Sequence, residues 1–98
     1  MKLLAIEREL DNKAGEGLKP LLMGEARRAW ELYQSGFIRE IYFVKDRPLA
    51  VVILEADTVD EAKRSLATLP LVKEGYIDFD LLPLVPYPGF ARLFKDQA

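Results

Sequence analysis

Hydrophobic residues are arranged along this chain in four short runs separated by helical or turn-like stretches. The four runs are apolar or rich in branched and aromatic side chains, which favour β-strands, and they span residues 2–9, 37–45, 48–56 and 75–85. The polar residues Asp46 and Arg47 separate the second run from the third, so these two runs are predicted to form a hairpin. Pro83 lacks a backbone N–H and therefore places the fourth strand at an edge of the sheet.

Two further stretches have helical features. Between about residues 21 and 35, apolar residues recur every three or four positions, at Leu22, Ala26, Ala29 and Tyr33. Charged residues fall elsewhere on this stretch, at Glu25, Arg28 and Glu31. This pattern predicts an amphipathic helix that ends at Gly36. A second helix is predicted to begin at Thr58, because Glu61 three residues later completes a capping box, and to end at about Leu69, before Pro70.

The resulting order, βαββαβ, predicts an α+β protein with the ferredoxin-like fold. Right-handed crossovers give a four-stranded antiparallel sheet in the order 4-1-3-2, with two helices on one face. Residues 1–86 form this domain, and residues 87–98 form a C-terminal arm.

Both faces of the predicted sheet are apolar. In the first strand Leu3 and Ala5 point to one face, and Leu4 and Ile6 point to the other. Because two helices cover only one face, we expect a second copy of the chain to cover the other, giving a homodimer with sheet packed on sheet. A monomer with an exposed apolar sheet is the alternative, and large exposed patches of this kind are rare.

Composition narrows the chemistry. The chain has 14 Lys and Arg against 16 Asp and Glu, with no block of like charge, so neither nucleic acid nor an anionic membrane is an expected partner. It has no Cys and no His, so proton transfer must use other groups, and a zinc site would have only oxygen ligands. Without a signal segment or a long apolar run, the expected location is the cytoplasm.

The segment LATLPLVKEGYIDFDLLPL resembles the muconolactone isomerase family of dimeric α/β barrels. The most specific parts are LPL at 69–71 and YIDFD at 76–80, with Arg39 matching an Arg at the start of the second strand. The resemblance extends from Met1 to about Phe90. The chain departs from the family at Glu40, where the family has His, at Phe43, where it has a basic residue, and in the spacer before the fourth strand.

The resemblance implies a small-molecule isomerase that uses neither metal nor cofactor. Such an enzyme moves a double bond in an unsaturated lactone or related acid by acid–base proton transfer. A dimer, or a larger ring built from dimers, is also implied. The alternatives are a non-catalytic small-ligand-binding dimer and a cofactor-independent oxygenase of the same fold.

Polar residues are expected to gather at one end of the sheet: Glu7, Arg8, Arg39, Glu40, Glu55, Asp78 and Asp80. Among them Glu40 is the catalytic candidate, because it takes the place of the family's His, and Tyr42 lies beside it on the same face. Arg39 points to the opposite face, where it pairs with an acid or, with the parity reversed, holds a substrate carboxylate. The alternative for Glu40 is a solvated ion pair at the rim of the sheet.

Aromatic residues supply the other site candidates. Trp30 and Tyr33 lie one turn apart and either line a substrate pocket or belong to the core. The loop at 11–17 lacks the spacings of phosphate-binding loops and is expected to form an edge of the pocket. The arm contains Pro86 and Pro88, which end the fourth strand.

The arm also carries apolar side chains that would be unfavourable in water, at Phe90, Leu93 and Phe94. We expect the arm to pack on the partner subunit, with Tyr87 and Phe90 in contact with that subunit and Tyr87 close enough to the pocket mouth to touch the substrate. An arm folded on its own helices is the alternative.

Overall fold

The computed structural model describes residues 1–10 and 17–95, so the loop predicted at 11–17 lies almost wholly outside the described residues. The longer elements are β1 (Lys2–Glu9), α1 (Leu22–Gln34), β2 (Ile38–Phe43), β3 (Ala50–Glu55), α2 (Val59–Leu66) and β4 (Ile77–Leu84). Short helices are η2 (Lys19–Leu21), α3 (Pro70–Lys73) and η3 (Pro88–Leu93).

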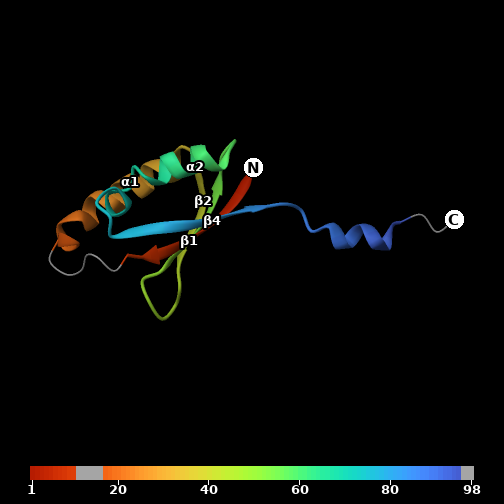
Figure 1. Cartoon of the computed structure of the whole chain (residues 1–98), viewed down its shortest axis with the longest axis horizontal. Coiled ribbons are helices and arrows are strands. Elements are labelled where there is room, and N and C mark those ends of the chain that lie inside the picture. Colours follow the sequence, from red (N-terminus) through yellow and green to blue (C-terminus); the bar gives the residue numbers. More distant parts are fainter. Residues whose placement is uncertain (11–16, 96–98) are drawn as a thin grey trace.

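The strands form one antiparallel sheet in the order β2-β3-β1-β4. Both α1 and α2 lie on the same side of it (Figure 1). The ferredoxin-like fold, the strand order and the edge position of Pro83 are therefore confirmed. The capping box is confirmed as well, since the hydroxyl of Thr58 accepts a 3.0 Å hydrogen bond from the N–H of Glu61. The second helix ends at Leu66 and a new one begins at Pro70, so the predicted single helix to Leu69 was slightly too long.

The core lies between the sheet and the helices. Its fully buried members include Leu3, Val52 and Leu54 from the two central strands. Leu32 from α1 and Leu66 from α2 close it from the helix side, each no more than 5% exposed. No buried polar or charged residue occurs among the described residues.

The opposite face of the sheet carries a second apolar layer, and none of the helices in residues 1–10 and 17–95 covers it. Leu4 pairs with Ile53 on one side and Leu82 on the other, and all three point away from the helices. Leu82 is 48% exposed and Leu84 is 39% exposed. We call this surface, made by Leu4, Ile6, Val51, Ile53, Leu82 and Leu84, the open face.

A bulge at Arg39 sets the direction of the side chains on β2. The register shifts between Ile38, which pairs with Leu54, and Glu40, which pairs with Ile53. Ile38 and Ile41 therefore both point toward the helices, whereas Glu40 points to the open face. Strict alternation along β2 would have placed Ile38 on the same face as Glu40. The extra residue at Arg39 interrupts that alternation.

The polar residues expected at one end of the sheet are divided between its two ends. Because β1 is antiparallel to both neighbours, Arg8 lies opposite Asp78, while Lys2 lies opposite Glu55 at the other end. Arg39 and Glu40 belong to the Glu55 end. The predicted single cluster was wrong because it grouped the end of β1 with the end of β3.

The arm projects away from the body of the chain (Figure 1). The molecule measures 66 × 28 × 21 Å, and its radius of gyration of 16.7 Å exceeds the roughly 13 Å of a compact domain of this size. Tyr87 and Phe90 pack edge to face, with ring centroids 5.0 Å apart, yet remain 64% and 66% exposed. The alternative of an arm folded on its own helices is therefore wrong. Contact with a partner stays a prediction.

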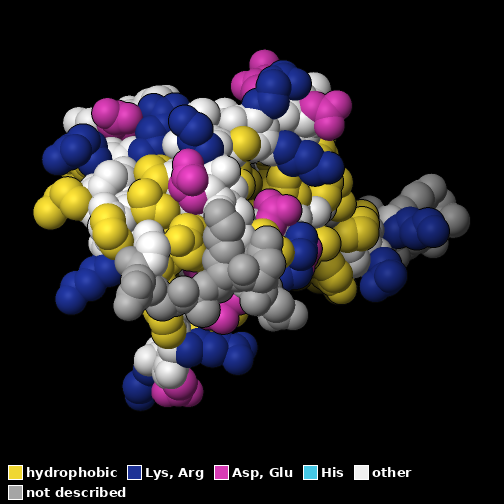
Figure 2. Space-filling model, turned by 60° about the vertical axis from the view of Figure 1, so that its left-hand side comes forward, with side chains coloured by type: hydrophobic (Ala, Val, Ile, Leu, Met, Phe, Trp, Pro, Cys, Tyr) yellow, Lys and Arg dark blue, Asp and Glu magenta, His cyan; other side chains and the backbone are white. Residues whose placement is uncertain are grey.

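Charges of both signs are interspersed on the face seen in Figure 2, with hydrophobic side chains between them. The described residues on this face form no continuous basic surface of the kind that binds nucleic acid. In the described part of the chain, no helix has the length and hydrophobicity needed to cross a membrane. The cytoplasmic location stays a prediction.

Candidate functional site

A cavity of about 290 Å³ lies between α1 and the sheet. Its walls are mostly apolar, with Ala29 from α1 facing Val52, Ile77 and Phe79 from the strands. Two carboxylic acids interrupt this lining among the described residues, Glu7 from β1 and Glu25 from α1. An apolar hollow with a few polar groups is the usual form of a small-molecule site.

Glu7 enters the cavity from the sheet. It follows Leu3 and Ala5 on the face of β1 that points toward the helices. Its Oε1 accepts a 3.0 Å hydrogen bond from the N–H of Ala50 at the start of β3. Burial raises the pKa of Glu7, the bond from Ala50 opposes that rise, and the charge of Glu9 adds to it.

Glu25 enters the cavity from the helix layer. Its Oε1 accepts a 2.9 Å hydrogen bond from the N–H of Leu71 in α3. Burial raises the pKa of Glu25, the bond from Leu71 opposes the rise, and the negative charge of Glu7 raises the pKa further. Both carboxyl groups are thus held in place by backbone N–H groups and are stronger bases than free glutamate.

The orientation of α1 explains why Glu25 is in the cavity. The buried side of the helix follows Glu25, Ala29 and Leu32, which are spaced by four and three residues. Leu22 and Tyr33, which the sequence placed on the buried side, are each 47% exposed. The prediction that Glu25 falls on the polar side of the helix was therefore wrong.

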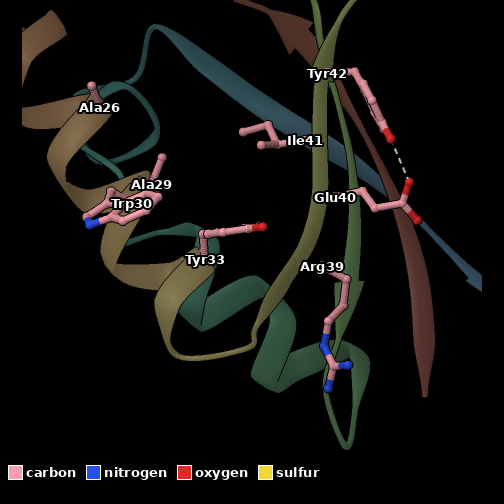
Figure 3. Close-up of a pocket in the computed structure, with 8 residues that line it drawn as sticks. All are labelled: Ala26, Ala29, Trp30, Tyr33, Arg39, Glu40, Ile41 and Tyr42. Atoms are coloured by element: carbon pink, nitrogen blue, oxygen red, sulfur yellow. Dashed lines mark hydrogen bonds between the residues drawn. The ribbon is translucent and has the colours of Figure 1, made fainter.

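A second, more open hollow of about 550 Å³ lies between α1 and β2, and we call it the groove (Figure 3). Trp30 and Tyr33 line it with stacked rings whose centroids are 5.7 Å apart. Trp30 is 58% exposed, so these rings do not belong to the core. The groove and the cavity share Ala26, Ala29 and Ile41, so the two hollows adjoin.

Glu40 and Tyr42 are neighbours, as the sequence predicted. The hydroxyl of Tyr42 donates a 2.7 Å hydrogen bond to Oε1 of Glu40, and this bond raises the pKa of Tyr42. Both side chains lie on the side of β2 away from Trp30 and Tyr33 (Figure 3). Both side chains are exposed, and the pair borders the groove rather than an enclosed cavity. Their catalytic role stays a prediction.

A sequence model of the family described as muconolactone delta-isomerase matches residues 4–89. The chain belongs to the muconolactone delta-isomerase family.

A solved structure of muconolactone isomerase is similar to this chain, with a TM-score of 0.73 and 19% sequence identity over 90% of this chain and 92% of that one. At this identity the likeness shows the fold. A protein from Agrobacterium tumefaciens matches over 89% of this chain and 96% of its own, with 15% identity, but its TM-score of 0.45 supports no argument. No curated protein sequence matches the chain.

In this member of the muconolactone delta-isomerase family, Arg39 lies at the bulge, where its Nε donates a 2.7 Å hydrogen bond to the carbonyl of Gly36. The pKa of Glu55 is lowered mainly by the amino group of Met1, which donates a 2.6 Å hydrogen bond to the Glu55 carboxylate. The charge of Arg39 lowers the pKa of Glu55 further. Arg39 also lines the groove, at the end of the sheet away from Glu7.

The sequence pattern favoured Glu40 as the catalytic residue and pointed to neither Glu7 nor Glu25 as a site residue. A usable signal existed for Glu7, which continues the inward alternation of Leu3 and Ala5 on the first strand. Glu25 had no such signal, because the sequence alone does not say which apolar residues of α1 pack on the sheet. A carboxylate at an inward position is unusual enough to mark a site.

Proposed function

We propose that this chain is a small-molecule isomerase that moves a double bond in an unsaturated lactone or related acid by acid–base proton transfer. The observation that supports this best is the pair of half-buried carboxyl groups, Glu7 and Glu25, in one apolar cavity. A raised pKa brings a carboxylate closer to the basicity that proton abstraction from carbon requires. Membership of the muconolactone delta-isomerase family points to the same class of reaction.

In the proposed reaction Glu25, as the carboxylate, removes a proton from the saturated carbon attached to the double bond that is conjugated with the lactone carbonyl. The electron pair of the broken C–H bond becomes part of a delocalised enolate. Glu25 then returns the proton to the other end of the allylic system, so the double bond moves and no atom is gained or lost.

The groove would guide the substrate to the cavity. Trp30 and Tyr33 offer flat apolar surfaces for an unsaturated ring, and Arg39 offers a charge at the far end. Glu40 with Tyr42 is the second candidate for the proton-transfer pair, supported by the 2.7 Å hydrogen bond between them and by their place at the border of the groove.

A homodimer is part of the same proposal. The open face is apolar and at least partly exposed, and a second copy would cover it by packing sheet against sheet. The projecting arm would then reach the partner, where Tyr87 and Phe90 would bury their exposed rings near the mouth of the cavity. In this proposal the arm forms part of the partner's binding site and is not needed for the folding of residues 1–86.

The test is turnover. The protein is incubated with muconolactone and, separately, with its methyl ester, and the ultraviolet absorbance of the conjugated lactone is followed. Wild type should convert at least one of them, and Glu25→Gln should lose most of that activity, since a positioned general base contributes about 100-fold or more. Absence of turnover of both compounds at high protein concentration would reject the proposal and leave a ligand-binding role.

A further inference from the structure

The first turn of α3 meets the carboxyl group of Glu25. Oε1 of Glu25 accepts its 2.9 Å hydrogen bond from the N–H of Leu71, 46 residues further along the chain. Leu69, the residue before α3, provides no side-chain oxygen to this turn. The carboxyl group of Glu25 therefore takes the place of a capping side chain and joins α1 to α3 at the wall of the cavity.

Pro70 sets the direction in which the Leu71 N–H points. Its ring fixes φ near −65° at the start of α3 and keeps the preceding Leu69 extended, with φ −70° and ψ 129°. The carbonyl of the same peptide group, that of Pro70, accepts a 2.9 Å hydrogen bond from the N–H of Glu74. Both ends of the peptide group that carries the Leu71 N–H are thus bonded.

Pro70 also lies against α1 directly beside Glu25. A methyl group placed on Gly24, the residue before Glu25, would lie 3.7 Å from Cγ of Pro70, which is ordinary van der Waals contact. Because Gly24 has no side chain, the proline ring lies beside the backbone of α1 at this point. The position of the ring therefore influences how closely the start of α3 approaches the Glu25 side chain.

The hydrogen bond from Leu71 makes the two oxygens of the Glu25 carboxylate unequal. The bond at Oε1 stabilises the ionised form and opposes the rise in the pKa of Glu25 that burial causes. Oε1 is engaged by this donor, so Oε2 is the oxygen left to take a proton from a substrate. A general base is efficient only when it is held within hydrogen-bonding reach of that proton.

We infer that Pro70 is a positioning residue for the proton transfer, because it holds the Leu71 N–H against Oε1 of Glu25 and so fixes the direction of Oε2. The role of Glu25 here rests on the proposed function, whereas that of Pro70 rests on the contacts of α3. Pro70 acts through Glu25 and touches no reacting atom.

The first measurement needs no turnover. Full-length wild type and Pro70→Ala are prepared with glutamate isotope-labelled at the side-chain carboxyl carbon, and the carboxyl groups are titrated by nuclear magnetic resonance. Glu25 should have a higher pKa in the variant, because the bond from Leu71 lowers it in wild type. General loosening of the cavity would have the opposite effect, since entering water would stabilise the ionised carboxylate and lower its pKa.

The second measurement is the rate with whichever of muconolactone and its methyl ester wild type converts. Pro70→Ala should lower kcat about tenfold or more and change KM less than about twofold, because a displaced base weakens the transition state more than substrate binding. The acidic limb of the pH–rate profile should move to higher pH with the pKa of Glu25. Pro48→Ala, the same substitution at an exposed position, is the matched control and should change neither quantity.

Replacement of Leu71 by the hydroxy acid with the same side chain removes the N–H donor directly. It serves as the second variant if Pro70→Ala fails to fold by circular dichroism, and it should also raise the pKa of Glu25. An unchanged or lowered pKa of Glu25 in the folded variants would overturn the inference.

The inference and the proposed function fail in different ways. A normal kcat in Pro70→Ala, with Glu25→Gln inactive, would reject the positioning role and leave the proposed function standing. A raised pKa of Glu25 in a protein without turnover would reject the proposed reaction and leave Pro70 as the residue that orients Glu25.

Discussion

Glu25 on α1 lies close enough to Glu7 on β1 for the charge of Glu7 to raise the pKa of Glu25. The two residues come from different layers of the fold and enter one apolar cavity between them. Each accepts a backbone N–H, from Ala50 and Leu71 respectively, so both carboxyl groups are oriented before any ligand arrives. Carboxyl pairs whose pKa values are shifted by burial are typical of sites that move protons.

The raised pKa values of Glu7 and Glu25 predict how stability depends on pH. A carboxyl group whose pKa is higher in the folded state than its usual 4.5 stabilises the fold fully below 4.5. This contribution is lost as the pH rises through the folded pKa. Urea unfolding at fixed protein concentration should therefore show a smaller loss of stability between pH 4.5 and 7 in the double variant Glu7→Gln/Glu25→Gln than in wild type.

Glu55 provides the contrast for that experiment, because its pKa is lowered and its contribution to stability has the opposite sign. Glu55→Gln should leave the decline above pH 4.5 in place. A double variant whose stability declines with pH as steeply as that of wild type would show that the cavity carboxyls are not desolvated as described.

The open face predicts a dimer that a single charge can disrupt. Ile53 lies near its centre, between Leu4 on β1 and Glu40 on β2. Ile53→Lys should weaken dimerisation by about 100-fold or more, because the ammonium would be buried without a partner, while circular dichroism stays native. Sedimentation velocity measures the effect, and Asp46→Lys at the exposed hairpin turn is the control. A wild-type chain that sediments as a monomer at micromolar concentration would rule out the dimer.

The arm predicts a coupled loss of assembly and ligand binding. Removal of residues 87–98 should weaken both, because the exposed rings of Tyr87 and Phe90 would otherwise bury against the partner. Tyr87→Ala alone should cost about 2 kcal/mol of dimerisation free energy if that ring is an interface anchor. A truncated protein that dimerises and binds the methyl ester normally would show that the arm has neither role.

The start of α2 gives a prediction independent of function. Thr58→Ala removes the side-chain oxygen that accepts the N–H of Glu61 and should lower the free energy of unfolding by about 1 kcal/mol. Thr58→Ser keeps the hydroxyl and should retain most of the stability. Equal losses in the two variants, measured by urea unfolding, would mean that the methyl group rather than the cap matters.

The fold was predictable from the sequence because each element carried its own local signal. The capping box at Thr58 and the polar turn between β2 and β3 fixed where elements begin and end, and the crossover rule then left one arrangement of the sheet. The bulge at Arg39 was less apparent, because one extra residue leaves the composition of a strand unchanged. Its trace is the spacing of Ile38 and Ile41, three apart yet both directed at the helices.

The site was harder to predict because the apolar residues of α1 are spread over a broad arc of the helix. Ala29 and Leu32 pack toward the sheet, whereas Trp30 and Tyr33 line the groove and are partly exposed. Local sequence does not say which side packs, since that depends on contacts with distant strands. The choice of the wrong side moved Glu25 from the cavity to the surface and directed attention to Glu40.

The most direct test of the central claim is proton exchange catalysed in heavy water. Muconolactone methyl ester is incubated with wild type, Glu25→Gln or Glu40→Gln, and deuterium incorporation at the allylic carbons is followed by nuclear magnetic resonance. Wild type should catalyse the exchange, Glu25→Gln should lose about 100-fold or more of it, and Glu40→Gln should lose much less. Exchange that survives in Glu25→Gln but disappears in Glu40→Gln would contradict the proposed role of Glu25 and assign the proton transfer to the pair on the other side of β2.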